Sequence, residues 1–128
     1  MARFLKQEWL DLQKDLARGL PERPGASARM QYKVNGAPDG DVTFHTVVEN
    51  GKIHENALGD DAQAEFTMTV GYNDFTAVNK GELDANAAFM QGRIKVTGNM
   101  GKLMSLMPLT QSAEYKAIAE KLDQSTEY

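Results

Sequence analysis

Cysteine is absent from the 128-residue sequence, which excludes disulfide bonds, thiolate metal sites and a cysteine nucleophile. No apolar run approaches the roughly 20 residues of a membrane span. The N-terminal segment MARFLKQEWL carries charges where a signal peptide needs a continuous hydrophobic region. The net charge of −4 provides no overall positive field for phosphates, so we expect no nucleic-acid partner. We expect a cytoplasmic protein that forms a single domain over residues 1–128.

The first periodic segment predicts a helix from Arg3 to Arg18. Its apolar residues recur at steps of four, three and four and lie on one helix face: Leu5, Trp9, Leu12 and Leu16. Gly19 and Pro21 are expected to end this helix.

The apolar period then changes to two, which predicts five strands over residues 28–35, 41–49, 52–58, 64–70 and 93–98. Asn50-Gly51 favours a two-residue type I′ hairpin, which would place His45 opposite Asn56 and Val47 opposite His54. On that register the apolar face carries Val42, Phe44, Val48, Ile53 and Ala57. The polar face carries His45, Glu49, Lys52, His54 and Asn56.

Helices are expected around and after the last strand. Asn73 or Asp74 can cap a helix that turns Phe75 inward, and Asp84 can cap a second short helix. A stripe at i, i+3, i+4 and i+7 predicts a third helix, which Pro108 ends: Met100, Leu103, Met104 and Met107. The segment SAEYKAIAEKL predicts a fourth helix, with one apolar face made of Tyr115, Ile118 and Leu122.

Few residues suit catalysis or cofactor binding. There is no G-x-S-x-G nucleophile motif, and we expect no catalytic residue, metal or cofactor. His45 and His54 form the one candidate metal pair, but two ligands without an evident third are more simply exposed strand residues. The G-x-x-G spacing at residues 98–101 matches a nucleic-acid backbone clamp, yet a tight strand-to-helix turn explains it more simply.

Methionine is concentrated near the C-terminal end of the predicted sheet, with four of the seven methionines at positions 90, 100, 104 and 107. An apolar stripe at helical spacing is ordinarily part of the core. Methionine is nevertheless unbranched and polarizable, which suits a surface that adapts to varied apolar partners. The composition therefore favours an apolar cavity without establishing one.

The block from Ala88 to Leu106, AFMQGRIKVTGNMGKLMSL, resembles the sterol carrier protein type 2 family, whose members share A-F-M-Q-G-K-L-K-[IV]-x-G-N/D-M-G before an apolar helix. The upstream segment AEFTMTVGYNDFTAVNKGELDANAAFM is similar to the family's lead-in. The resemblance implies an α+β fold in which a five-stranded, mostly antiparallel sheet has helices covering one face and encloses an apolar lipid tunnel. It further implies binding of sterols, fatty acids, fatty acyl-CoA and phospholipids without chemical change.

Position by position, the family block implies that eight residues contact ligand: Phe89, Met90, Gln91, Ile94, Val96, Met100, Leu103 and Met104. The apolar pattern adds four more: Phe66, Met68, Phe75 and Met107. Gln91 would be the main polar group of the lining. Lys102 departs from the family, which commonly has an apolar residue there. The ending STEY lacks the S-K-L peroxisomal signal, so import by that signal is not expected.

The first hypothesis is therefore a non-catalytic lipid-binding and lipid-transfer protein that contacts membranes at most transiently. The alternative is an accessory module that presents a hydrophobic intermediate to a lipid-processing enzyme, or that receives an apolar helix of such a partner. A third, metal-dependent hypothesis rests on His45 and His54 alone.

Overall fold

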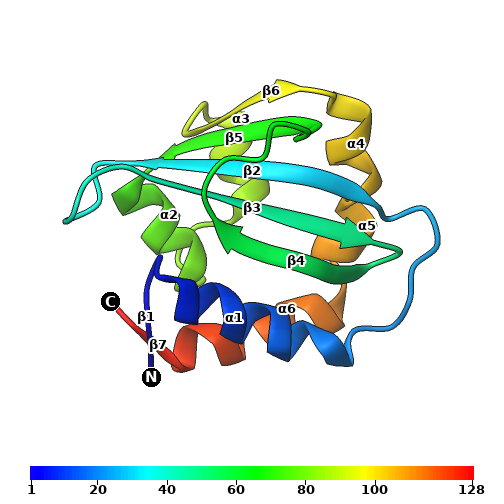
Figure 1. The fold of residues 1–128 in the computed structure, drawn as a ribbon, viewed down its shortest axis with the longest axis horizontal. Coiled ribbons are helices and arrows are strands. Elements are labelled where there is room, and N and C mark those ends of the chain that lie inside the picture. The colour runs from blue at the N-terminus through cyan, green and yellow to red at the C-terminus, as the bar shows by residue number, and fades with distance from the viewer.

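The computed structural model describes all 128 residues and contains a five-stranded sheet with helices on one face (Figure 1). The strands are β2 (Ala28–Asn35), β3 (Val42–Glu49), β4 (Lys52–Leu58), β5 (Phe66–Gly71) and β6 (Ile94–Gly98). Their spatial order is β4-β3-β2-β5-β6; β2 and β5 are parallel, and the other neighbouring pairs are antiparallel. The expected five-stranded, mostly antiparallel sheet of an α+β fold is confirmed.

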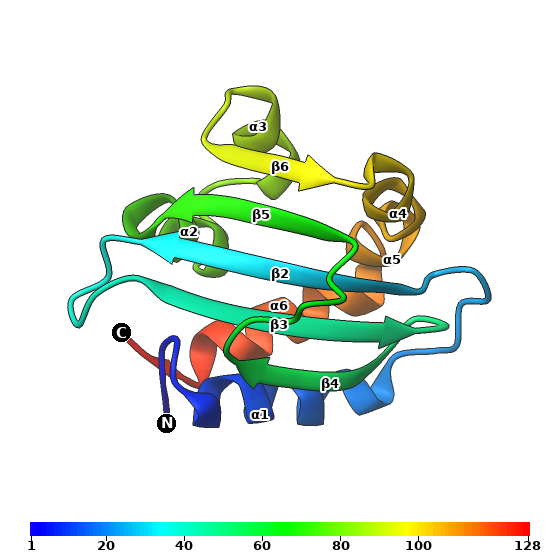
Figure 2. The ribbon, with the colours of Figure 1, turned by 45° about the horizontal axis from the view of Figure 1, so that its top comes forward.

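The helices are α1 (Gln7–Leu16), α2 (Tyr72–Asn79), α3 (Ala85–Met90), α4 (Met100–Ser105), α5 (Met107–Thr110) and α6 (Ala113–Gln124), and a 3-10 turn at Ala17–Gly19 follows α1. Figures 1 and 2 show α1 and α6 side by side beneath the sheet, while α3 and α4 lie at opposite ends of β6. The β4–β5 connection crosses the other face of the sheet. None of these helices has the length and apolarity needed to cross a bilayer.

The β3–β4 hairpin turns as expected but pairs differently beyond its first residues. Asn50 and Gly51 have φ values of 49° and 82°, the positive values that a type I′ turn requires. A bulge then shifts the register, so that His45 pairs with Ala57 and not with Asn56. A shift of one residue exchanges the two faces of a strand. The expected pairings of His45 and Val47, and the face assignments of Ala57 and Asn56, were therefore wrong.

Asn56 shows the consequence of this bulge, because its side chain is 5% exposed and faces the helices. Its Nδ2 donates hydrogen bonds to the Leu10 carbonyl and to Gln13 Oε1, both at 2.9 Å. Its Oδ1 accepts a hydrogen bond from Thr46 Oγ1 at 2.6 Å. A buried amide with all these partners costs little, and it fixes α1 against the edge strand β4.

The first helix begins four residues later than the pattern predicts. Ala2–Arg3 forms a short strand, β1, that pairs in parallel with β7 (Thr126–Glu127). Leu5 is buried at 4% exposure but has a positive φ of 61°, so it is not helical. A two-residue strand is too short to show an alternating apolar pattern, so the sequence could not predict β1 or β7. Their pairing arises from tertiary contacts between the two ends of the chain.

Helix boundaries in the C-terminal half confirm one cap and correct two expectations. Asp84 Oδ2 accepts a hydrogen bond from the Ala87 amide at 3.0 Å, as expected of a cap. Neither Asn73 nor Asp74 caps α2, which starts directly after Gly71 without a side-chain cap. The predicted helix through Met107 is divided, because Pro108 lies in the first turn of α5, where its missing N–H has no intrahelical partner to lose.

Two clusters of buried side chains fill the space between sheet and helices. The first cluster contains Ala2, Phe4, Leu5, Trp9, Leu10, Val34, Phe44, Val70, Ala88, Ile94 and Leu122. The second cluster contains Ala17, Leu20, Ala26, Ala28, Met30, Val48, Phe66, Leu106 and Leu109. The core is thus divided into two parts along the length of the sheet.

Candidate functional site

The boundary between the two clusters lies under one row of the sheet. Tyr32 of β2 pairs with Met68 of β5, which pairs with Val96 of β6. These three side chains pack against both clusters, and each remains only half-buried. We call this boundary the seam.

The rows on either side of the seam are closed. On one side, Val34, Val70 and Ile94 pair across the same three strands and are 0%, 2% and 7% exposed. On the other side, Met30 and Phe66 pair with each other and are 8% and 1% exposed. The seam is therefore the row on this face of the sheet that stays partly accessible between two buried rows.

Gly98 is required by the close approach of β6 to β5 next to the seam. It pairs with Phe66 and has a φ of +111°. A Cβ at this position would lie 2.6 Å from the Glu65 carbonyl oxygen and 2.8 Å from the Phe66 Cα. The G-x-x-G spacing therefore has a packing role at this end of β6.

The lower wall of the seam is α6. Its inward face packs Tyr115 and Ile118 against the second cluster and contributes Leu122 to the first. The sequence predicted this face, and the structure confirms it. Because one helix contacts both clusters, α6 passes beneath the seam opposite Tyr32 and its neighbours.

Two partly accessible tyrosines, Tyr32 and Tyr115, pack against the second cluster. Burial raises the pKa of the Tyr32 hydroxyl well above its usual range, and the neighbouring Tyr115 adds to that increase. Burial likewise raises the pKa of Tyr115. Neither hydroxyl has a hydrogen bond contributing to its pKa, and both side chains remain partly accessible. Sequence reasoning did not select these residues, although a tyrosine within an apolar stripe signals a polar atom inside the protein.

Six of the twelve predicted ligand-binding residues belong to or pack against the two clusters, and a seventh, Met107, is half-buried in α5. Phe66 and Ile94 are buried. Met68, Phe75, Val96, Leu103 and Met107 are half-buried. The structure thus gathers residues of β5, β6, α2, α4 and α5 around the underside of the sheet.

The other five lie on the outside, where α3 and α4 flank β6 (Figure 2). Phe89, Met90, Met100 and Met104 are 39%, 86%, 41% and 65% exposed, and Gln91 is also exposed. Helical spacing places Met100 and Met104 on one stripe with Leu103 and Met107, but α4 has only six residues, and Met100 and Met104 are turned outward. The ligand contacts assigned to all twelve residues stay predictions.

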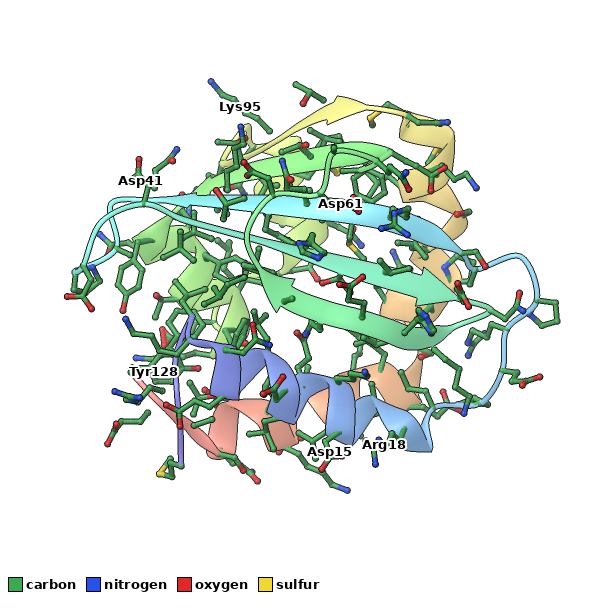
Figure 3. The ribbon with its side chains drawn as sticks, viewed as in Figure 1. Asp15, Arg18, Asp41, Asp61, Lys95 and Tyr128 are labelled. Atoms are coloured by element: carbon green, nitrogen blue, oxygen red, sulfur yellow. The ribbon has the colours of Figure 1, made fainter.

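Two open hollows on the surface have a different character. One lies along α1 and the C-terminal segment and includes Glu8, Asp11, Lys14, Asp15 and Arg18. Figure 3 shows Asp15 on α1 and Arg18 in the 3-10 turn that follows it, both away from the sheet. The other lies beside Gly36 and the start of α2. Neither contains a predicted ligand-binding residue, and their polar linings do not suit an apolar ligand.

His45 lies on the outer face of the sheet, but it is buried at 9% exposure because the β4–β5 connection packs against it, so the expectation of an exposed residue was wrong for His45. Its Nδ1 lies 2.8 Å from the Gly59 carbonyl oxygen, a hydrogen bond that raises the pKa of the ring. Two further hydrogen bonds attach the β4–β5 connection to the sheet. The Asp61 amide donates to Gln31 Oε1 at 2.8 Å, and Arg29 Nε donates to Asp61 Oδ2 at 3.0 Å (Figure 3). His54 is exposed, and no group of three histidine, aspartate, glutamate or cysteine side chains is placed to hold a metal.

Comparison with known proteins agrees with this architecture. Residues 8–111 match the model of the SCP-2 sterol transfer family. The chain belongs to that family. It is 32% identical over 98 residues to the non-specific lipid-transfer protein-like 1 of Caenorhabditis elegans, a match that covers 75% of this chain and 79% of the relative.

The chain also matches part of a much longer protein and nearly the whole of a solved structure. It is 38% identical over 81 residues to human sterol carrier protein 2, covering 61% of this chain but only 14% of that protein. A crystal structure of sterol carrier protein 2 superposes with a TM-score of 0.75 at 16% identity and covers 92% of this chain and 98% of that one. The resemblance seen in residues 64–107 is confirmed, and the fold is that of the family.

Proposed function

We propose that this chain binds apolar lipids in the seam and transfers them without catalysis. The candidate ligands are sterols, fatty acids, fatty acyl-CoA and phospholipids. The observation that carries the proposal is the half-buried row of Tyr32, Met68 and Val96 between two closed rows. A lipid entering there would contact apolar side chains of the sheet above and of α6 below.

The apolar term supplies enough free energy for such a carrier. Burying one CH₂ group contributes about 0.8 kcal/mol, so ten to sixteen of them contribute roughly 8–13 kcal/mol. Association and ordering of the chain cost at least about 4 kcal/mol. The remaining roughly 4–9 kcal/mol corresponds to dissociation constants from about millimolar for the shortest chains to sub-micromolar for the longest, with selectivity that depends mainly on shape.

The short helices α4 and α5 are the elements we expect to move when lipid enters. They have six and four residues, and the buried residues Leu106 and Leu109 attach them to the second cluster. Leu103 and Met107 are only half-buried, so displacing these helices sacrifices less packing than displacing α1.

An accessory role beside a lipid-processing enzyme is the second candidate function. Phe89, Met90, Met100 and Met104 expose large apolar side chains at both ends of β6. Exposed apolar surface of this kind marks contact with a partner or a lipid surface. Copurification with such an enzyme would favour this role over free transfer.

A matched pair of substitutions tests the location of the ligand. Val96→Phe places a larger side chain in the seam, whereas Thr97→Phe places the same side chain on the exposed neighbouring position of β6. Titration with a fluorescent fatty acid should show about tenfold weaker binding for Val96→Phe and less than about twofold change for Thr97→Phe. Equal affinities in both variants would place the lipid elsewhere.

The carrier function itself is tested on the unmodified protein. Native mass spectrometry of freshly purified protein, with organic extraction, identifies lipids that copurify. Titration with a sterol, a fatty acid, a fatty acyl-CoA and a phospholipid completes the test. A protein that binds none of the four contradicts the proposed function.

A further inference from the structure

We propose that the free edge of the sheet docks on the surface of a membrane that contains anionic lipids. The docking surface consists of β6 and the two helices at its ends, α3 and α4, and we call it the β6 edge. The inference rests on the proposed transfer function and adds to it the surface at which the protein meets the membranes that donate and accept lipid.

The β6 edge forms one border of the molecule. β6 is the last strand of the sheet, so one of its sides has no neighbouring strand. Figure 2 shows α3 and α4 at opposite ends of β6, on the border that lies away from α1. Figure 3 shows Lys95 pointing away from the protein at this border. A flat surface placed against the border would therefore meet all three elements.

Exposed apolar side chains are concentrated on the β6 edge. Seven large apolar side chains of the protein are exposed, and four of them belong to this one surface: Phe89, Met90, Met100 and Met104. Such a concentration is typical of a surface that is covered by a partner or by lipid. Methionine is unbranched and flexible, which suits contact with disordered acyl chains.

The charge of the β6 edge favours an anionic lipid surface as the partner. Residues 85–113 contain Arg93, Lys95 and Lys102 and no acidic residue, so this segment carries a charge of +3. The whole chain carries −4, and the remaining residues therefore carry −7. Basic side chains beside exposed apolar ones suit a membrane interface, where the cations meet headgroups and the apolar groups enter the acyl boundary. Repulsion of the other residues from the same headgroups favours one orientation.

The three basic side chains are available to lipid headgroups. Lys95 is exposed and has no ion-pair partner. Arg93 Nη1 lies 3.7 Å from Asp74 Oδ1, and Lys102 Nζ lies 3.4 Å from Glu65 Oε2. All four paired side chains remain accessible to solvent, and ion pairs of this kind contribute little stability. Headgroup phosphates can therefore replace either carboxylate as the partner.

Helix α4 connects the β6 edge to the candidate site. Its Leu103 packs against the second cluster, whereas Met100 and Met104 of the same helix are exposed. Docking would therefore bring a helix that we expect to move during lipid entry into contact with the membrane. Lipid would then pass between the bilayer and the seam without crossing water.

Vesicle binding by matched variants tests the β6 edge. The probes are vesicles of phosphatidylcholine alone and of phosphatidylcholine with about 30% phosphatidylserine, and sedimentation measures the bound protein. Lys95→Gln and Met90→Gln should each weaken binding to the mixed vesicles about fivefold, because one loses a headgroup contact and the other an apolar contact. The controls are Lys121→Gln, on α6, and Leu58→Gln, at the end of β4, which should each change binding less than about twofold.

Two further measurements separate docking from lipid binding in solution. Raising the salt concentration to about 0.5 M should remove most of the preference for phosphatidylserine. Lys95 is not a predicted ligand-binding residue, so Lys95→Gln should keep the wild-type affinity for a fluorescent fatty acid in solution. The same variant should transfer that fatty acid between mixed vesicles more slowly than the wild type.

Several outcomes would contradict docking through this surface. Equal vesicle binding by Lys95→Gln and Lys121→Gln, or no preference for phosphatidylserine in the wild type, overturns the proposal while lipid binding stands. A wild type that binds neither kind of vesicle also overturns it and leaves the exposed apolar side chains to a protein partner. A wild type that binds no lipid in solution contradicts the proposed function instead.

Discussion

The two core clusters differ in how they are closed. The first is rich in aromatic contacts, with Phe4 and Trp9 rings 5.1 Å apart and Phe4 and Tyr128 rings 5.0 Å apart. It joins α1, the sheet and both ends of the chain. The second is closed by two short helices and the inward face of α6. From this difference we expect the first cluster to hold the fold together and the second to be the part that yields to a ligand.

The largest expected effect comes from opening the first cluster. Trp9 is 2% exposed, and Trp9→Ala should lower the free energy of unfolding by about 3–5 kcal/mol because it leaves a large cavity. Chemical denaturation of the ligand-free protein measures this loss. A loss below about 1 kcal/mol would remove the distinction between the two clusters.

The approach of β6 to β5 is the next most sensitive feature. Gly98→Ala should destabilise the protein by about 1–3 kcal/mol, because φ is +111° and the added Cβ would lie 2.6 Å from the Glu65 carbonyl oxygen. Gly19→Ala is the control, since Gly19 has no positive φ and an added Cβ there would have no atom within 4 Å, so alanine should stabilise by about 0.4–1 kcal/mol. Thermal melting of both variants should show shifts in opposite directions. Equal changes in Tm for the two variants would show that Gly98 has no special packing role.

Ligand should stabilise the second cluster more than the first. We expect amides of α4 and α5 to exchange faster than those of α1 in the ligand-free protein, because their side chains are less buried. Addition of a long-chain fatty acid should slow exchange most in α4 and α5. Hydrogen-exchange mass spectrometry measures both states. Uniform protection along the chain would contradict a local role for these helices.

Met104 sharpens the comparison between the interior and the exposed methionines. Because its side chain is 65% exposed, Met104→Asp should change the free energy of unfolding by less than about 1 kcal/mol. Met68→Asp, at a half-buried position of the seam, should cost several times more. Denaturant titration compares the two variants. A severe loss with Met104→Asp would mean that α4 turns this residue inward.

The smallest expected effect concerns pH and the outer face of the sheet. The hydrogen bond with the Gly59 carbonyl raises the pKa of His45 above 6.5, so the protonated ring contributes stability below about pH 6.5. That contribution is lost as the pH rises through the folded-state pKa. His45→Gln should therefore lower Tm more at about pH 5.5 than at about pH 8.5, whereas His54→Gln, at an exposed position, should not. The same Tm difference at both pH values would exclude this contribution.

Local patterns in the sequence determined the elements that carry their own signal. Strict alternation defined β2 and the inward face of β5, and Asn50-Gly51 defined the hairpin turn. Asp84 marked the start of α3. The block from Ala88 to Leu106 was specific enough to indicate the family. Each of these features depends on residues close together in the chain, which is why periodicity and motifs were sufficient.

Only the tertiary structure decided which face of a helix or strand packs against the rest of the chain. The bulge that turns Asn56 inward is stabilised by α1, more than forty residues away in sequence. The exposure of Met90 and Met104 depends on which helix face meets the sheet, and the seam exists because Tyr32, Met68 and Val96 come together from three strands that lie far apart in the sequence. A residue pattern encodes a face, but only long-range packing determines what that face contacts.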